Sequence, residues 1–484
     1  MGFDLKDLLE SRSGEGAELW SRYLNPQTAR VLRSVGLDRK WVRAEGPYLW
    51  DDQGDTYLDW LAGFGVFGLG RNHPVVRQAL SQVLDGELAD MVKMDTPLLA
   101  GLLAEALVAR APYLDRVYLC NSGTEAVEAA IKFARYYTKR PRILYCGHAY
   151  HGLTAGSLSV NGGKSFKAGF GPMLPGSEIP FGDLAALERA TSKGDVAALI
   201  VEPVQGKGVH VAPPGFLAGA ARVLHDSGAL LICDEVQAGL GRTGRFFSFE
   251  LDEVQPDLVT IAKTLSGGFV PVAATMARQA VFSAVYSSMT RVLVHDTTYS
   301  HNNMAAAAGL AALSVIDDEG LLANAAERGD ELRRALEDAA ARFELIKEVR
   351  GRGLMVGVEF GLPSSIRLKS RYAPLTMLRK GLFTQMVVCA LFEEHRILTQ
   401  TAADHMDVLK LLPPLATTSD DVRWFVSSFE AVMSAIEASS RPVWQFARGL
   451  ATRSMDGRRV GVTTRPVGSR CHGETTVVSR HFVA

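Results

Sequence analysis

The chain has 484 residues, of which 47% are hydrophobic and 22% charged, and its formal net charge is −1. This length and composition are typical of a globular protein with two or three domains. The near-zero charge excludes a general attraction for nucleic acid or an anionic membrane. No apolar run approaches the roughly 18 residues of a membrane-spanning helix, and residues 1–20 do not resemble a secretory signal. The five cysteines form no CxxC pair, which favours no metal site and a reduced, cytoplasmic setting.

From about residue 116, short apolar runs rich in β-branched residues alternate with amphipathic stretches. Strands are predicted at 116–120, 142–146, 196–204, 229–236 and 257–263, with helices at 124–137 and 215–228. This alternation predicts an α/β fold whose mostly parallel sheet is covered on both faces. Ligands of such sheets bind at the carboxyl ends of the strands.

The segments around this block differ from it in pattern. A short hairpin is predicted within 46–66, a long helix from about Asn303, a surface helix at 323–343 and a strand at 354–360. The predicted division is an N-terminal segment, 1–75, that packs with a small domain, a large domain at 76–320, a small α/β domain at 321–440, and an extension at 441–484. The extension is rich in arginine, threonine, serine and glycine, which predicts a flexible or loosely docked tail.

Lys263 follows an apolar strand and precedes the sequence TLSGG. A lysine is usually a solvated surface residue. Here its amine would lie at the mouth of a parallel sheet, beside a glycine pair that permits close approach of a ligand. A desolvated lysine loses its proton more readily and can attack a carbonyl group. Lys263 is therefore a candidate Schiff-base lysine.

Two further strand ends carry polar residues. Asp234 follows the apolar run LLIC, where a buried carboxylate needs a cationic partner such as a protonated pyridine nitrogen. The segment 121–124, NSGT, joins a strand to a helix, where free backbone N–H groups form an anion site suited to a phosphate ester. Taken singly, Asp234 could cap a loop and the NSGT segment could be an ordinary helix cap.

Together with their neighbours, these residues resemble the class III (ω) aminotransferases, fold-type-I enzymes that depend on pyridoxal 5′-phosphate (PLP). The similarity extends from about residue 25 to about residue 440. The motifs that carry it are AEGPYLWDDQGDTYLDWLAGFGVFGLGRNHP, NSGTEAVEAAIKFAR, VEPVQG, DEVQAGLGRTGRFFSFE, IAKTLSGG, TTYSHNNMAAAAGL and RGRGLMVGVEF. The resemblance implies a large domain with a mostly parallel seven-stranded sheet and a smaller α/β domain.

The resemblance also implies a role for individual residues. Lys263 would hold PLP as a Schiff base and move the proton, and Asp234 would pair with the pyridine nitrogen. The remaining implied cofactor-binding residues are Ser122, Gly123 and Thr124 at the phosphate, Tyr150 on the ring face, His151, Glu202 and Val236 beside the cofactor, Gln237 near the ring hydroxyl, and Thr298 at the phosphate of the other subunit. A shared site of this kind implies a homodimer.

The sequence departs from the family where an α-carboxylate is bound. Members that bind one often have an arginine two residues before a Pro-Pro-Leu run, and this chain has Lys410 there. A lysine cannot offer a carboxylate the bidentate fork of an arginine. Trp60 and Phe64 belong to a segment that lines the substrate entrance in relatives, although core packing explains them equally well. The hypothesis is a donor or acceptor that reacts at a terminal amine or aldehyde, such as a diamine, an ω-amino acid or an apolar aldehyde.

The motifs leave other reactions open. Decarboxylation, racemisation, amino-group migration and elimination use the same scaffold with the same lysine and aspartate. A non-catalytic relative that senses an amine is a further alternative, although the retained Lys263 and Asp234 argue against it. The prediction is an aminotransferase that takes a small amine donor and a carbonyl acceptor in a ping-pong mechanism, without nucleic acid or membrane partners.

Overall fold

The computed structural model describes residues 3–403 and 406–459. The described chain divides into a unit within residues 39–446 and a second unit that includes residues 3–38 and 447–459. In the second unit, short helices α1 (Leu5–Ser11), α2 (Gly16–Tyr23) and α3 (Pro26–Val35) follow one another. Asp4 and Asn25 cap the first and third of these with side-chain oxygens. The predicted site residues all lie in the larger unit, to which the following description applies.

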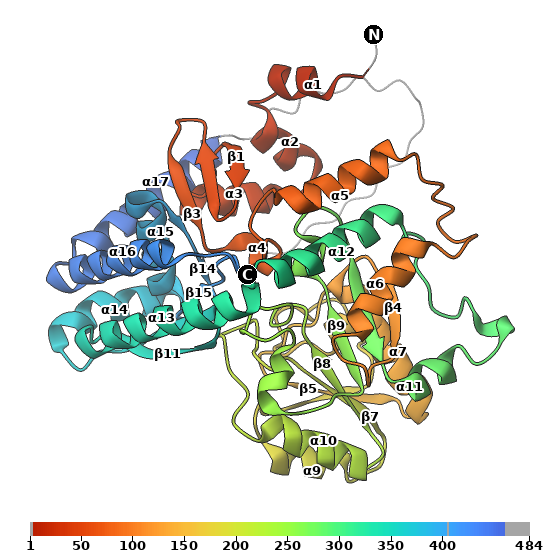
Figure 1. Cartoon of the computed structure of the whole chain (residues 1–484). Helices are drawn as coiled ribbons and strands as arrows, with labels where there is room; N and C mark the ends of the chain where they lie inside the picture. Colours follow the sequence, from red (N-terminus) through yellow and green to blue (C-terminus); the bar gives the residue numbers. More distant parts are fainter. Residues whose placement is uncertain (1–2, 404–405, 460–484) are drawn as a thin grey trace, which may run out of the picture. The chain divides into compact units, whose positions relative to one another are not determined.

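A seven-stranded sheet forms the centre of the larger unit (Figure 1). Its strands are β4 (Arg116–Cys120), β5 (Arg142–Cys146), β6 (Gly176–Ile179), β7 (Val196–Val201), β8 (Leu230–Asp234), β9 (Leu258–Ile261) and β10 (Ala273–Ala277). Their order is β4-β10-β9-β8-β7-β5-β6. Only β10 runs antiparallel to its neighbours, so the predicted mostly parallel seven-stranded sheet is confirmed. Three strands end earlier than predicted: β7, β8 and β9 stop at residues 201, 234 and 261, where the predicted ends were 204, 236 and 263.

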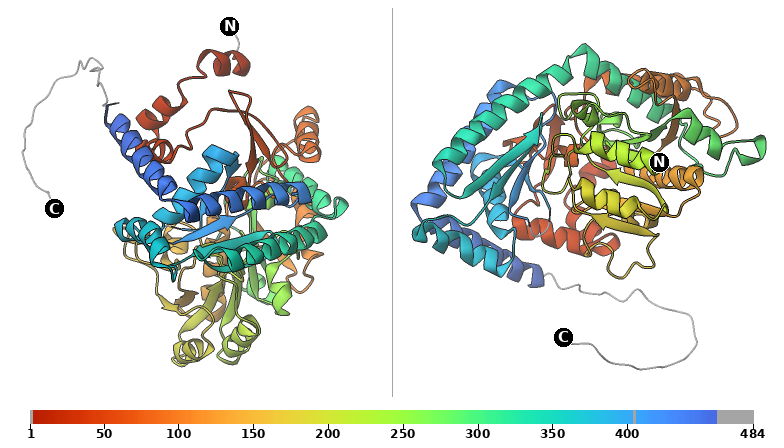
Figure 2. Two further views of the ribbon diagram at one scale, coloured as in Figure 1. Left: turned by 90° about the vertical axis from the view of Figure 1, so that its left-hand side faces the viewer. Right: turned by 90° about the horizontal axis from the view of Figure 1, so that it is seen from below.

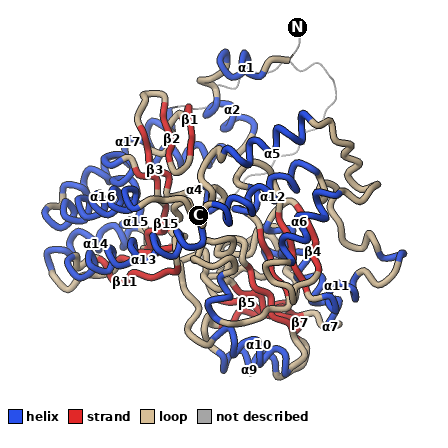
Figure 3. Tube along the Cα trace, viewed as in Figure 1, coloured by secondary structure: helices blue, strands red, loops and turns tan. Residues whose placement is uncertain are grey.

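Alternating strand residues face two separate cores on the two sides of this sheet. Leu144 and Cys146 of β5 join one core, whereas Ile143 and Tyr145 join the other. The first core is covered by α5 (Pro74–Asp85), α6 (Leu98–Val108), α9 (Leu184–Thr191), α10 (Phe216–Asp226) and α12 (Asn303–Asp318), and the second by α7 (Gly123–Thr138) and α11 (Gln279–Val285). Figure 3 shows the strands enclosed by these helices. Because both faces are covered, a central strand such as β7, with the sequence VAALIV, is apolar and buried along its whole length.

Short helices occupy several loops around this sheet. They are α4 (Ala62–Gly65), α8 (Ala155–Ser159), η1 (Ser248–Asp252), η2 (Lys263–Ser266) and η3 (Met289–Arg291). Two of them, α4 and η2, lie at the carboxyl ends of the central strands, and residues of both line the cavity described below.

Two smaller four-stranded sheets complete the larger unit. The first has the order β1-β2-β3-β13, with β1 (Trp41–Glu45), β2 (Tyr48–Asp51), β3 (Thr56–Asp59) and β13 (Ile397–Leu398). The second has the order β11-β12-β15-β14, with β11 (Ile346–Arg352), β12 (Met355–Phe360), β14 (Gln400–Thr401) and β15 (Val408–Leu411). The predicted hairpin in 46–66 is therefore part of a larger sheet. Strand β13, from the distant C-terminal region, pairs with β3 in parallel and completes this sheet.

A third core joins these two sheets to four helices, α13 (Leu321–Arg342), α14 (Ile366–Leu378), α15 (Leu382–His395) and α16 (Ser419–Ala438). Leu58 and Trp60 share this core with Leu332 and Phe425, so residues before the large sheet pack with residues after it. Figure 2 shows α13 and α16 side by side. The predicted domain boundaries at residues 75, 320 and 440 stay a prediction.

The tail differs from its prediction over the described residues. Helix α17 spans Arg441–Arg459, where a flexible or loosely docked extension was predicted. Composition alone concealed the apolar residues Val443 and Phe446, which lie one helical turn apart and pack on the third core. The arginines of the tail at positions 465, 470 and 480 lie outside the described residues.

Membrane-spanning potential is limited in the described ranges. No single helix there has the length and apolar character to cross a bilayer, and only α14 and α15 would meet both criteria if taken together, across a bend of 106°.

Gly329 tests how closely the third core is packed. A Cβ at this position in α13 would overlap with the backbone carbonyl of Gly353, so Gly329→Ala is expected to destabilise the protein by roughly 1–3 kcal/mol. Gly101→Ala in α6 is the matched control, since a Cβ there meets no atom within 4 Å, and a small gain of about 0.5–1 kcal/mol is expected. Urea unfolding midpoints measure both changes, and equal midpoints for the two variants would contradict the packing.

Candidate active site

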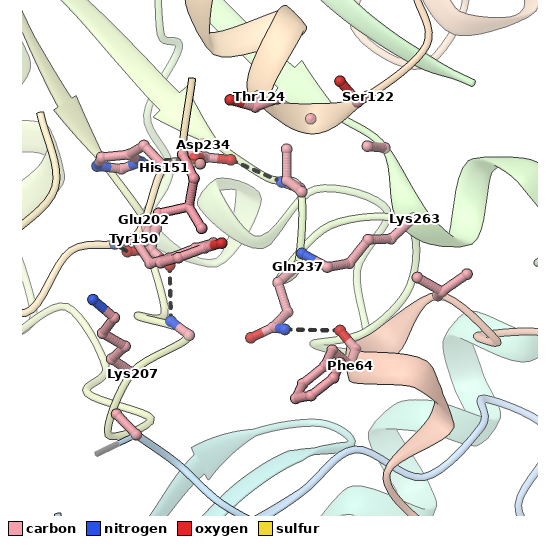
Figure 4. Close-up of a pocket in the computed structure, with 18 of the residues that line it drawn as sticks. Phe64, Ser122, Thr124, Tyr150, His151, Glu202, Lys207, Asp234, Gln237 and Lys263 are labelled. Atoms are coloured by element: carbon pink, nitrogen blue, oxygen red, sulfur yellow. Dashed lines mark hydrogen bonds and ion pairs between the residues drawn. The ribbon is translucent and has the colours of Figure 1, made fainter. Parts of the chain in front are cut away.

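A cavity of about 1020 Å³ opens at the carboxyl ends of the central strands (Figure 4). Its volume is at the upper end of the range for small-molecule sites. Twelve of the fourteen predicted site residues line it: Phe64, Ser122, Gly123, Thr124, Tyr150, His151, Glu202, Asp234, Val236, Gln237, Lys263 and Lys410. Segments that are far apart in the sequence therefore meet at one place, as expected for a parallel sheet.

Lys263 projects into this cavity from the first residue of η2. Its backbone has a φ of 51°, a strained conformation that non-glycine residues adopt mostly at functional positions. No hydrogen-bond partner of its amine is found among the described residues. Burial lowers the pKa of Lys263, although Asp234 and Glu202 oppose the shift. A lowered pKa favours the neutral amine that can attack a carbonyl group.

Asp234 ends β8 and is held by three donors. His151 Nδ1 lies 2.7 Å from Oδ2, and Oδ1 accepts hydrogen bonds from the Val236 N–H at 3.1 Å and the Thr260 hydroxyl at 3.0 Å. The carboxylate is 4% exposed, so these bonds fix its orientation while it still faces the cavity. His151 thus lies behind Asp234, and its backbone N–H donates to Asn161 Oδ1 at 2.6 Å.

The start of α7 is the predicted phosphate site and lines the cavity. Ser122 is the N-cap residue, and the Glu125 carboxylate accepts hydrogen bonds from the Asn121 N–H and the Ser122 hydroxyl at 2.8 and 3.1 Å. The N–H groups of Gly123 and Thr124 in the first turn have no partner within the helix. A Cβ at Gly123 would lie 2.9 Å from Val236 Cγ1. Glycine at this position therefore permits the close approach of Val236 to the start of α7.

The Thr124 hydroxyl belongs to a cluster of three. It lies 2.7 Å from Thr154 Oγ1 and 2.6 Å from Ser157 Oγ. The Thr154 hydroxyl in turn donates to Glu128 Oε1 at 2.6 Å. The cluster fixes the Thr124 side chain, so the backbone N–H groups are the open donors of this predicted phosphate site.

Glu202 and Tyr150 form another part of the cavity wall. Glu202 is buried and accepts hydrogen bonds from the backbone N–H groups of Tyr150 and Gly206 at 2.9 and 2.8 Å. Burial raises the pKa of Glu202, an effect that the nearby His151 opposes. The Tyr150 ring is 37% exposed and meets Phe166 edge-on, with 6.0 Å between ring centroids. One face of the cavity is thus aromatic.

Gln237, Phe64 and Lys410 meet at the remaining side. Gln237 Nε2 donates to the Phe64 carbonyl oxygen at 2.8 Å, and Gln237 Oε1 accepts from Lys410 Nζ at 2.7 Å. Lys410 also donates to the Gly206 carbonyl oxygen at 2.7 Å. The Lys410 ammonium group, predicted to contact substrate, thus already has two protein acceptors.

Two predicted residues do not line the cavity. Trp60 is completely buried and stacks on Phe425, with 4.6 Å between ring centroids, so its predicted place at the substrate entrance is wrong. The reason is its position after β3, which directs it into the third core. Thr298 is an exposed residue in the loop before α12 and does not line the cavity of its own chain.

Lys207 and Phe166 were not predicted as site residues. Lys207 Nζ lies 4.2 Å from the centroid of the Phe166 ring and 5.2 Å from that of Tyr150, and all three residues line the cavity. The position of Lys207 directly after the VEPVQG motif was the available signal. Phe166 lies in an irregular loop without any periodic pattern that could have placed it.

The comparisons with known proteins agree with this geometry. Residues 33–433 match the family model "Aminotransferase class-III". Aminotransferase PigE of a Serratia species is 35% identical in an alignment of 447 residues that covers 85% of this chain and 52% of that protein. The chain therefore spans about half the length of this curated relative.

Solved structures give the same family. Ornithine aminotransferase from Toxoplasma gondii superposes with a TM-score of 0.74 at 31% identity, over 83% of this chain and 91% of that one. An amine transaminase from an uncultivated Pseudomonas species, in its PLP-bound form, gives 0.72 at 29% identity, over 82% and 95%. A transaminase from the marine bacterium Virgibacillus gives 0.75 at 26%, over 83% and 94%. The chain belongs to the class III aminotransferases, which are PLP-dependent enzymes.

The residues of this cavity fit PLP. The cofactor has an aldehyde, a phosphate and a protonatable pyridine nitrogen. The Lys263 amine complements the aldehyde, the backbone donors of α7 complement the phosphate, and the Asp234 carboxylate complements the pyridine nitrogen. All of these groups line the same cavity. Two observations support this fit. The Lys263 amine has no hydrogen-bond partner in the described part of the chain, and the nearby Asp234 carboxylate is held by three donors.

Asp234→Asn should weaken cofactor binding while leaving the fold intact. Removal of the charge costs the pyridine nitrogen its ionic partner, and hydrogen bonds to charged groups contribute about 1.5–3 kcal/mol. The PLP dissociation constant, measured by absorbance titration, should therefore rise roughly 10- to 100-fold. Asp257→Asn is the control, because Asp257 is equally buried but bonds to His225 and Arg278 outside the cavity. Unchanged PLP affinity in the Asp234 variant would refute this assignment.

Proposed function

We propose that the chain transfers an amino group from a small amine donor to a carbonyl acceptor in a ping-pong cycle, with Lys263 as the proton-transferring residue. Bound PLP supplies an electron sink and carries the amino group between the two half-reactions. The observation that supports this proposal is the convergence of Lys263, Asp234 and the α7 N-terminus on one cavity.

Each residue has a task that its surroundings explain. The Lys263 amine, with its lowered pKa, binds the cofactor and then accepts and returns a proton at the carbon of the reacting amine. Asp234 stabilises positive charge at the pyridine nitrogen, and His151 keeps its carboxylate in position. Glu202 holds the backbone of Tyr150, so that the aromatic ring covers the reaction site and reduces its contact with water.

The lining of the cavity favours donors and acceptors without an α-carboxylate. Among the described residues that line it, none is an arginine, so no bidentate partner for a carboxylate is present there. Lys263 is assigned to the cofactor, Lys410 already has two acceptors, and the Lys207 amine lies over the rings of Phe166 and Tyr150. The aromatic side chains of Phe64, Tyr150 and Phe166 offer apolar contacts instead. We therefore propose substrates that react at a terminal amine or aldehyde.

We also propose that two copies of the chain form a homodimer. Two adjoining segments carry a set of exposed apolar side chains that a monomer would leave in water: Leu88, Met91, Met94, Leu98 and Leu102, with Met289, Val292, Leu293, Val294 and Tyr299. Lys93 joins the segments through Asp296 and Ser300, both at 2.6 Å. Thr298 is exposed within this surface, where it could reach the phosphate site of the second copy.

Lys263→Ala tests the proposed reaction. The wild-type protein with PLP, given diamines, ω-amino acids or simple alkylamines, should change its visible absorbance and release a carbonyl product. The variant should do so roughly 10²- to 10⁴-fold more slowly or not at all, because the proton-transfer group is lost. Lys193→Ala, an exposed lysine outside the cavity, should react normally. Product release without consumption of a carbonyl acceptor in full turnover would indicate another PLP reaction.

Charge placed in the exposed apolar surface tests the dimer. Wild type should sediment at about twice the chain mass of 52.4 kDa. Met289→Glu with Leu293→Glu should shift this to a single chain, because buried carboxylates are costly at an interface. Met377→Glu with Leu378→Glu is the matched control, since these residues of α14 are similarly exposed. A wild-type monomer, or dissociation in the control alone, would contradict the proposal.

A further inference from the structure

We propose that Lys410 is a positioning residue that holds Gln237, and through it the backbone at Phe64, rather than a ligand for a substrate carboxylate. This inference rests on the proposed function only in taking the cavity as the PLP site. It assigns a new role to a residue that stands where relatives that bind an α-carboxylate often have arginine.

Lys410 links segments that are distant in sequence. Its strand β15 pairs with β12 at Gly357 and with β14 at Gln400, so its backbone is fixed on both sides. Its side chain is 4% exposed and reaches the Gly206 carbonyl oxygen after β7 and the Gln237 side chain after β8. Lys410 therefore connects the small C-terminal sheet to two loops of the large one.

The bond from Lys410 determines how the Gln237 amide is oriented. An amide presents an acceptor at one end and a donor at the other. With Oε1 bound to Lys410, Nε2 must face away, and there it donates to the Phe64 carbonyl oxygen. Phe64 has a φ of 60° between two glycines of positive φ, a conformation that needs external support. Loss of Lys410 would free the amide to rotate and remove that support.

The electrostatic environment makes Lys410 a poor carboxylate ligand. Burial lowers its pKa to about 7, and the nearby Lys263 and Arg242 shift it in the same direction against Glu202. Both acceptors of its amine are uncharged oxygen atoms. A neutral amine retains two N–H groups, which equals the number of these acceptors, so the bonds do not require the charge. A positioning role fits this balance, whereas recognition of a carboxylate requires the charge.

Lys410→Met tests the inference by two readouts. It preserves the length and volume of the side chain but removes every donor. The PLP dissociation constant, measured by absorbance titration without substrate, should rise about tenfold because Gln237 loses its orientation. The kcat/KM values for two donors, 4-aminobutyrate and butylamine, should fall equally, although butylamine lacks the carboxylate. A fall confined to 4-aminobutyrate, with PLP affinity unchanged, would identify a carboxylate ligand and overturn the proposal.

A double-mutant cycle with Gln237→Ala distinguishes positioning from independent contacts. If Lys410 acts through Gln237, adding Lys410→Met to the Gln237→Ala protein should change PLP affinity less than twofold, because the shared interaction is already lost. Multiplied effects would overturn the proposal. Lys193→Met controls for the loss of a lysine, and Gln237→Ala alone reports on the same link if the Lys410 variant fails to fold. The cofactor readout needs no turnover, so failure of the proposed reaction remains distinguishable.

Discussion

The structure of this active site depends on one constraint: a carboxylate and an amine are both removed from bulk water at the ends of neighbouring strands. Asp234 is stabilised there by His151, by its own loop through the Val236 N–H, and by Thr260 of the adjacent strand. These donors keep the charge buried yet oriented toward the cavity. Lys263 follows the next strand, where burial lowers its pKa and the nearby Asp234 and Glu202 oppose that shift. The parallel pairing of β8 with β9 holds these two strand ends side by side, with Asp234 opposite Thr260.

The sequence predicted those parts of the fold and site that depend on local pattern. The alternation of apolar strands and helices indicated the parallel sheet. Asp234, Lys263 and the helix start at Gly123 stood out in the sequence because each lies at, or within three residues of, the end of an apolar strand. Tertiary packing determined the rest. Trp60 was misplaced because an aromatic residue beside a glycine-rich segment fits a core and a pocket equally well. Helix α17 was missed because its arginines obscured Val443 and Phe446.

Contacts between remote segments were outside the reach of any local pattern. The Lys410–Gln237–Phe64 chain joins positions separated by more than 170 residues at each step, and Lys207 meets Phe166 across an irregular loop. The first of these contacts lies where a small apolar cluster joins the sheet of Lys410 to loops of the large sheet, through Val204 and Ala238 on one side and Met355 and Leu412 on the other. The sequence identified the family and its cofactor correctly, but the partners that orient the side chains of the cavity emerge only from the folded chain.

The three larger hydrophobic cores support different parts of the site. Asp234, Lys263 and the α7 N-terminus rest on the two cores of the large sheet, whereas Lys410 stands on the sheet that the third core supports. Local unfolding of the third core would therefore release Lys410, and with it the orientation of Gln237 and Phe64, while the two cores of the large sheet stay folded. Mutational drift in the third core can thus reach both substrate selection and cofactor affinity through a single side chain.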